Sequence, residues 1–301
     1  NFFILHEGLI SLVDDELLEK NYDDLLDDCS ASMPVKDEFC DAKGQGGWLG
    51  FTDKYWMSVL IPDPNEPINV NYRHGNNGRD NYRTGYVGQI FKIAPGESIQ
   101  YDGKLFAGAK KLDILSNYDK TLSIPRFTDA IDWGWFAFLT KPVSYSINWF
   151  FGYVGNFGLA IIAFTILMRL ILFPLAHASF KSMAKMKKLQ PEMQRLKETY
   201  PNDRQKMQQE LMALYKREGA NPVAGCLPIL VQIPIFFSLY KVLFVTIEMY
   251  HAPFYGWIHD LSAPDPLGIL ILFGLVPWDV PPILSIVNIG ILPIIMGLTM
   301  W

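Results

Sequence analysis

A single arginine interrupts an apolar run that is long enough to cross a membrane. Arg169 lies in the stretch AFTILMRLILFPLA, residues 163–176. Insertion scales assign an arginine at the centre of a membrane helix a cost of roughly 2.5–3.5 kcal/mol, so the residue needs a partner or a function. No acidic residue occurs in this run or in a second apolar run, residues 223–247. The guanidinium is therefore available to an arriving anion, such as a carboxylate on a passing polypeptide.

Two uncharged polar residues accompany the arginine in the apolar runs. Thr165 precedes Arg169 by four residues, so the two side chains share a helix face. Gln232 lies in the second run between Pro228 and Pro234, which loosen the backbone around it. In hydrocarbon each polar group would need a hydrogen-bonding partner. Three such groups at similar depth therefore predict a water-containing groove.

The charged residues in the apolar runs can also have a purely structural role, without binding a substrate. Arg169 lies eight residues before His177, about 12 Å of helix, so it can snorkel towards the interface. Alternatively, it can pair with a carboxylate on a helix outside this sequence. Lys241 lies near the opposite membrane surface, seven residues before Glu248, and is expected to snorkel.

Charge and hydrophobicity divide the chain into segments with different environments. Residues 1–147 carry 22 acidic and 14 basic side chains and contain no long apolar run. The segment 179–221 holds ten lysines or arginines against five acids, so the positive-inside rule places it in the cytoplasm. A third apolar run begins near Ile283 and reaches Trp301. Because the chain begins with neither a methionine nor a signal peptide, it is expected to be part of a longer membrane protein.

These features predict a membrane protein in which an extracytoplasmic β-sandwich is followed by an α-helical transmembrane core with a cytoplasmic helical hairpin. In chain order, the predicted segments are a periplasmic β-sandwich domain (1–128), an interfacial amphipathic helix (129–153), a transmembrane helix (154–177), the hairpin (178–221), a second transmembrane helix (222–248), a periplasmic loop (249–282) and the start of a third transmembrane helix (283–301).

The first half of the chain carries strand and turn signals. GWLGFTDKYWMSVLIPDP predicts one strand that two prolines end, and GYVGQIFKIAPGESIQYDGKLFAG predicts two strands around a Pro-Gly turn. The acidic residues 14–28 are interpreted as a solvated face or loop. Cys29 and Cys40 can form a disulfide, although sequence spacing does not decide it, and Cys226 is expected to pack as a small hydrophobe.

Helical segments are predicted on both sides of the first membrane run. Residues 129–148 are rich in aromatic side chains, which favours an interfacial helix with Trp133 and Trp135 at headgroup depth and an end near Pro142. After the run, heptad spacing predicts two antiparallel helices, joined at YPND with Asn202 or Asp203 as an N-cap and stopped at residues 219–222. Their facing residues are Met186, Leu189, Met193, Leu196, Tyr200, Met207, Leu211 and Leu214.

The sequence contains no pattern that indicates catalysis, a metal site or a cofactor. There is no phosphate-binding loop, the five histidines are scattered, and GQGGWLG lacks the spacing of a dinucleotide-binding motif. The chain is therefore predicted not to be an enzyme, and to bind neither cofactor nor metal.

Several long motifs resemble the YidC membrane protein insertases of Gram-negative bacteria. They are NPVAGCLPILVQIPIFFSLYKVL, SMAKMKKLQPEMQRLK, QQELMALYKREGANP and APFYGWIHDLSAPDP, with GGWLGFTDKYW similar to part of the periplasmic domain of that family. The resemblance extends through nearly the whole chain. It implies a multi-pass protein of the bacterial inner membrane whose N-terminal half is periplasmic and resembles a sugar-binding type of β-sandwich.

The resemblance also implies a function and a substrate-binding groove. Members of the family hold a hydrophilic groove in the membrane with one arginine in it, and Arg169 matches that arginine. Thr165, Gln232 and Phe236 match groove or substrate-contact positions. The groove receives polar parts of a nascent membrane protein while its apolar segment slides into lipid, without nucleotide hydrolysis.

Partners implied by the resemblance are nascent membrane proteins, the Sec translocon, the ribosome, the signal recognition particle receptor and membrane lipids, with no direct nucleic-acid specificity. The hairpin is expected to be mobile. Family members also have an N-terminal anchor helix and five core spans, so groove residues on further helices are not assigned here.

Two other classes of protein remain as alternatives. A solute transporter with an intramembrane cationic site would be expected to show repeated halves and paired polar sites on broken helices, which this sequence lacks. A periplasmic sugar-binding receptor would place the function in the first half. Deleting that half distinguishes the receptor from the insertase.

Overall fold

The computed structural model describes two compact units. Described are residues 5–29, 40–76, 78–201, 203–219, 225, 227–276, 281, 284 and 287–300. The N-terminal unit comprises Asn1–Ala137 and Lys241–His251, and the helical unit comprises Phe138–Tyr240 and Ala252–Trp301. Predictions for Cys226, Asn202, Asn221, Pro222 and Ile283 concern positions outside the described residues.

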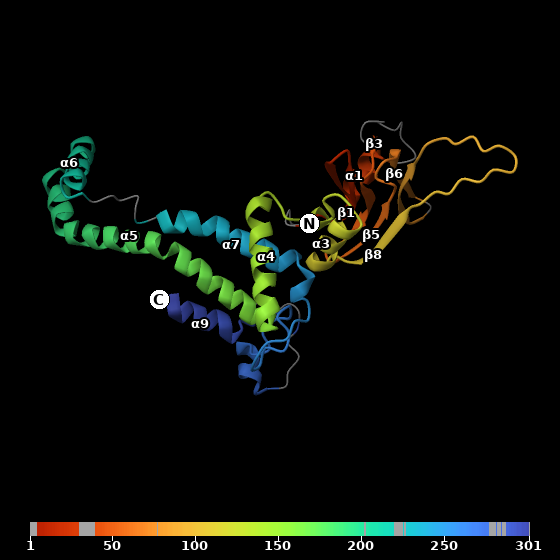
Figure 1. The fold of residues 1–301 in the computed structure, drawn as a ribbon. Helices are drawn as coiled ribbons and strands as arrows, with labels where there is room; N and C mark the ends of the chain where they lie inside the picture. Colours follow the sequence, from red (N-terminus) through yellow and green to blue (C-terminus); the bar gives the residue numbers. More distant parts are fainter. Residues whose placement is uncertain are drawn as a thin grey trace. The chain divides into compact units, whose positions relative to one another are not determined.

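A five-stranded antiparallel sheet forms the centre of the N-terminal unit (Figure 1). Its strand order is β2-β1-β4-β5-β8, and Leu12 on β1 lies opposite Trp48 on β4. The strands are β1 (Gly8–Val13), β2 (Glu16–Asn21), β4 (Trp48–Thr52), β5 (Trp56–Ile61) and β8 (Lys104–Ala109).

A smaller antiparallel sheet packs on one face of the first. Its order is β3-β6-β7, formed by β3 (Asp41–Gln45), β6 (Pro67–Asn76) and β7 (Asp80–Val87). Leu9 and Leu49 of the larger sheet share a core with residues of the smaller one, among them Val70 and Tyr72. The Tyr72 hydroxyl lies 2.6 Å from the Ser11 hydroxyl within this layer. The prediction of a β-sandwich is therefore confirmed.

Helices cover the other face of the five-stranded sheet. They are α3 (Leu112–Thr121) and the 3-10 helix η1 (Phe127–Ala130), while α1 (Tyr22–Asp28) adds Leu25 to the core between the sheets. Ile10, Leu12 and Trp48 face these helices and are buried with Leu115 and Phe127. Because both faces of the sheet are covered, all six residues of β1 are buried and the usual alternation of strand exposure is absent.

Two strand predictions need correction. The stretch from Trp48 to Ile61 forms two strands, not one, because a tight turn reverses the chain: the Asp53 amide donates to the Trp56 carbonyl at 2.8 Å. The predicted Pro-Gly turn is present at Pro95–Gly96. However, β7 and β8 on its two sides belong to different sheets, and residues 88–103 form an extended arm without strand pairing (Figure 1).

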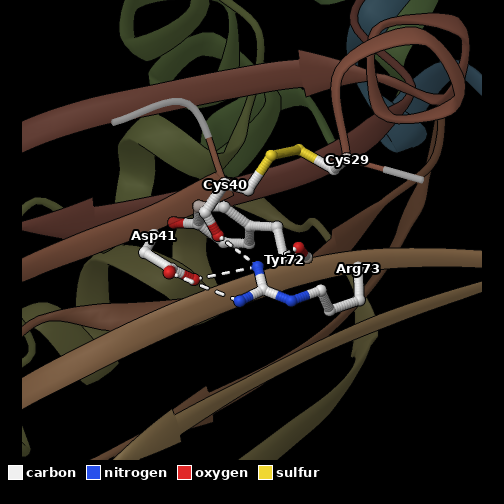
Figure 2. Close-up of a disulfide and its surroundings, with 5 residues drawn as sticks. All are labelled: Cys29, Cys40, Asp41, Tyr72 and Arg73. Carbon is white, nitrogen blue, oxygen red and sulfur yellow. Dashed lines mark hydrogen bonds and ion pairs between the residues drawn. A yellow bond between two sulfur atoms is a disulfide. The ribbon is translucent and has the colours of Figure 1, made fainter. Parts of the chain in front are cut away.

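A disulfide joins Cys29 at the end of α1 to Cys40 next to β3 (Figure 2). The Cα atoms lie 5.6 Å apart, and both cysteines are fully buried between the sheets. Arg73 on β6 donates to the Cys40 carbonyl at 3.1 Å and forms an ion pair with Asp41 at 2.9 Å (Figure 2). The disulfide therefore belongs to the folded core of the sandwich.

In the described residues of the helical unit, the named secondary-structure elements are all helices, and loops connect them. They are α4 (Ala137–Val154), α5 (Phe157–Thr199), α6 (Arg204–Arg217), α7 (Leu227–Val245), the 3-10 helix η4 (Ile269–Gly274) and α9 (Ile291–Met300). The last residues of α7 belong to the N-terminal unit, as does the 3-10 helix η3 (Ile247–Met249).

The segment before the first membrane run differs from its prediction in two respects. Helix α4 continues twelve residues beyond Pro142 instead of ending there. A proline early in a helix removes few backbone hydrogen bonds, and the Pro142 carbonyl also accepts the Ser146 hydroxyl at 2.7 Å. Trp133 is buried in the core of the N-terminal unit and donates to the Thr128 carbonyl at 2.9 Å, whereas Trp135 is 97% exposed. The prediction that Trp133 lies at the membrane surface is therefore wrong, because its side chain packs in the core of the N-terminal unit.

Candidate functional site

Helix α5 carries the arginine on which the candidate site depends. Asn156 caps its N-terminus by accepting the Leu159 amide at 3.1 Å. The whole helix has 43 residues and is about 64 Å long at 1.5 Å per residue. Pro174 and Pro191 lie inside it without ending it. It is therefore about twice as long as a membrane crossing requires.

Arg169 lies near the middle of the apolar part of α5. It follows Phe157 by twelve residues, about 18 Å along the helix axis. The side chain is exposed, and no described residue forms a hydrogen bond or ion pair with its guanidinium. Thr165, one turn earlier, donates its hydroxyl to the Ile161 carbonyl at 2.8 Å. That bond satisfies the hydroxyl proton and leaves the oxygen able to accept from a neighbour or from water.

Helix α7 presents the other two predicted site residues one turn apart. Gln232 and Phe236 are both exposed, Phe236 by 66%. Pro234 lies between them, and the Ser238 hydroxyl donates to its carbonyl at 2.8 Å. The glutamine amide and the phenyl ring thus occupy the same face of α7, next to the proline.

Hydrogen bonds near the two ends of the apolar part of α5 connect it with the segments that flank α7. The Ser179 hydroxyl donates to the Gly225 carbonyl at 3.1 Å, before α7 begins. The Asn156 side chain donates to the Pro253 carbonyl at 3.0 Å, after α7 has ended. Along α5, Arg169 lies ten residues, about 15 Å, before Ser179, and along α7, Phe236 lies nine residues, about 14 Å, after Leu227. The two residues therefore lie at similar distances along their helices from the hydrogen bond between Ser179 and Gly225.

The four predicted site residues form two pairs on two helices. Thr165 and Arg169 share a face of α5, and Gln232 and Phe236 share a face of α7. Within the part of the chain that the structure describes, no hydrogen bond or ring contact joins one pair to the other. The structure therefore does not bring the four side chains together by direct contacts, and the groove between the two helices stays a prediction.

The apolar parts of α5 and α7 are long enough to cross a membrane. Only 11% of the most apolar window of α5 and 22% of that of α7 are buried inside the protein. A core helix of a soluble protein would be largely buried instead. Exposed side chains such as Leu170 and Phe173 on α5 and Ile233 on α7 therefore fit contact with lipid.

The second half of α5 packs against α6 as a helical hairpin. Leu189 and Leu214 are buried between the helices with Met186, Met193 and Leu196 around them, which agrees with the predicted heptad spacing. Asp203 is the N-cap of α6 and accepts the Lys206 amide at 3.0 Å. The methionines of this cluster therefore pack inside the hairpin.

Lys241 does not snorkel, contrary to its prediction. Its side chain is 7% exposed, and its ammonium lies 2.7 Å from the Asp132 carboxylate. The partner lies 109 residues earlier in the chain, so sequence spacing gave no signal for it. Asp132 was not predicted to have a role.

A two-sheet domain followed by exposed apolar helices and a basic hairpin fits a class of membrane proteins that carry a folded domain outside the bilayer. Residues 149–301 match the family model of the 60Kd inner membrane protein, and residues 1–146 match that of the YidC periplasmic domain. The chain belongs to the YidC family of membrane protein insertases.

Curated relatives agree with the family models. The chain is 50% identical over 299 residues to the membrane protein insertases YidC of Rickettsia typhi and Rickettsia prowazekii, covering 99% of this chain and 52% and 51% of those proteins. It is also 50% identical over 304 residues to that of a Ruegeria species, covering 100% of this chain and 50% of the relative. The chain thus spans about half the length of the curated relatives it matches.

Proposed function

We propose that the protein containing this chain is a membrane protein insertase, which receives polar segments of nascent membrane proteins in a groove between α5 and α7. The observation that carries the proposal is Arg169, an exposed cation near the middle of the apolar part of α5. A cation in this position attracts a carboxylate more strongly than it would in bulk water, because the surrounding dielectric is lower.

The proposed mechanism needs no chemical step. A polar tail of the substrate enters the hydrated space beside Arg169, while the adjoining apolar segment contacts the exposed side chains of the two helices. Burial of that segment in lipid then provides the driving force, at about 0.8 kcal/mol for each buried methylene group. Gln232 and Thr165 would keep the groove hydrated, and Phe236 would contact the apolar segment. These roles are part of the proposal.

The proposed partners follow from family membership and from the charge of the hairpin. Nascent membrane proteins and lipids are the substrates and surroundings of an insertase. The ten basic residues between 179 and 221 would favour negatively charged partners, which fits the ribosome. We include the Sec translocon and the signal recognition particle receptor as proposed partners because of the family alone.

Reconstitution tests the proposed function directly. Liposomes containing the purified full-length protein are expected to insert a single-span substrate without added nucleotide, as measured by protection of the substrate from protease. Protein-free liposomes and liposomes with an unrelated multi-span protein serve as controls. Equal protection in all three preparations would reject the insertase proposal.

The proposed orientation places the N-terminal unit in the periplasm and the hairpin in the cytoplasm. An oxidising compartment preserves disulfides, whereas the cytoplasm keeps thiols reduced. In membranes prepared with a thiol-blocking reagent, mass spectrometry is expected to find the Cys29 peptide linked to the Cys40 peptide. Recovery of both cysteines in the blocked, reduced form would contradict the periplasmic placement.

A further inference from the structure

The C-terminal end of α7 is part of the core of the N-terminal unit. Val245 is 2% exposed and belongs to the same buried cluster as Trp133 and Leu112, with Phe244 packed against that cluster. Lys54 lies 4.0 Å from the centre of the Phe244 ring. The last five residues of α7, Lys241 to Val245, thus pack with side chains of the β domain.

A half-buried carboxylate, Asp132, connects this helix end to a loop of the β domain. Asp132 accepts the His6 amide at 2.9 Å, the Gly134 amide at 3.0 Å and the Lys241 ammonium at 2.7 Å. Gly134 has φ +66°, and an added Cβ would lie 3.3 Å from Cε of Lys241. A glycine at this position therefore allows the lysine side chain to approach the carboxylate closely.

A second carboxylate attaches the segment that follows α7. Glu248 accepts the Leu112 amide at 3.2 Å, at the start of α3. The N-cap residue of α3, Lys111, makes no side-chain capping bond, so Glu248 supplies an acceptor that a local cap would otherwise provide. The segment 241–248 is thus attached to the β domain at both ends, through Lys241 to Asp132 and through Glu248 to the Leu112 amide.

Other charged groups surround the ion pair. Lys110 is buried and donates to the Thr52 hydroxyl at 2.8 Å, and burial lowers the pKa of its ammonium to about 8. The pKa of Glu19, which is exposed on β2, is raised by partial desolvation and by the nearby Asp132 carboxylate, whereas the Lys241 ammonium opposes this increase. Removing one charge of such a cluster leaves another buried without compensation, which costs more than removing both partners of a pair.

We propose that Asp132 and Lys241 form a positioning pair that fixes the C-terminal end of α7 on the β domain. Phe236 lies five residues before Lys241 on the same helix, about 7.5 Å along its axis. A shift of the lysine along or around the axis would therefore carry the phenyl ring with it. This consequence for the groove rests on the proposed insertase function, whereas the attachment itself does not.

A double-mutant cycle in the full-length protein tests the attachment. The variants are Asp132→Asn, Lys241→Met and the double variant, with Lys120→Met as the control because Lys120 is exposed on α3. Amide hydrogen exchange of residues 242–250 in lipid is the first readout. Each single variant is expected to exchange roughly tenfold faster or more, since each removes one charge of the ion pair and leaves the charge of the other residue without its closest opposite charge. The double variant is expected to exchange more slowly than either single variant.

Insertion of substrates with neutral and with acidic tails is the second readout. Each single variant is expected to lower both rates by a similar factor, because a displaced Phe236 contacts the apolar segment that both substrates share. Unchanged exchange in the single variants, or strictly additive effects in the double variant, would overturn the attachment. Faster exchange with both insertion rates unchanged would show that the ion pair between Asp132 and Lys241 does not position Phe236 for insertion. If the parent protein inserts nothing, the proposed function fails, and the exchange data still decide the attachment.

Discussion

Replacing Arg169 by alanine in the full-length protein is expected to slow insertion of a substrate with an acidic tail by about tenfold. The reason is that two opposite charges about 4 Å apart attract each other by roughly 1 kcal/mol in water and roughly 4 kcal/mol near a protein surface. Insertion of a substrate with a neutral tail is expected to change far less. Arg169→Lys keeps the charge and is expected to retain most of the activity. The measurement is protease protection of both substrates in liposomes.

A matched control separates a local role of Arg169 from a general need for positive charge. Lys181→Ala removes an exposed cation from the same helix twelve residues further on, about 18 Å away, and is expected to leave both insertion rates unchanged. Raising the salt concentration should weaken the preference for the acidic tail only where water reaches the groove. Equal insertion of both tails by the alanine variant would show that electrostatic capture by Arg169 is wrong.

Truncation of Trp48 to alanine is expected to destabilise the N-terminal unit by about 3–5 kcal/mol. The indole is fully buried, contacts the Phe127 ring edge to face at 5.7 Å and donates to the Pro125 carbonyl at 3.0 Å. The substitution would leave a cavity beside η1 and an unsatisfied carbonyl. The free energy of unfolding can be measured in the full-length protein from the urea dependence of protease cleavage between residues 1 and 128.

Trp56 provides the matched control on the same sheet. Its side chain is 59% exposed on β5, so Trp56→Ala is expected to cost below about 1 kcal/mol. Comparable losses in the two variants would mean that burial between the sheet and its helices does not determine the stability of this domain.

Local patterns predicted the features that depend on neighbouring residues in the chain. The apolar runs, the Asp203 N-cap and the heptad spacing around Leu189 can each be recognised from residues that are close together in the sequence. The structure shows the corresponding helices. The β-sandwich also followed from short strands and turns. The candidate groove was predicted from an unpartnered arginine, a signal that composition alone reveals.

Long-range packing determined what the sequence did not predict. Trp133 has the aromatic character of a membrane-surface residue, but a core built from β1, β5 and α3 buries it. Lys241 has the spacing of a snorkelling residue, but its partner Asp132 comes from a loop more than a hundred residues earlier. Neither outcome can be read from periodicity, because each depends on which distant segments share a core.

The burial of Val245 in the β-domain core has a consequence for biosynthesis. A ribosome makes the strands of that domain first, then α5, the hairpin and α7, so Val245 and Glu248 appear only after both spans have been synthesised. Until then Trp133 and its neighbours lack one packing partner, and the start of α3 lacks the Glu248 acceptor. Completion of the domain core therefore waits for the synthesis of α7. In the proposed orientation, it also requires the end of α7 to reach the periplasmic side of the membrane, so the final folding step of the domain would report that the chain had reached that orientation.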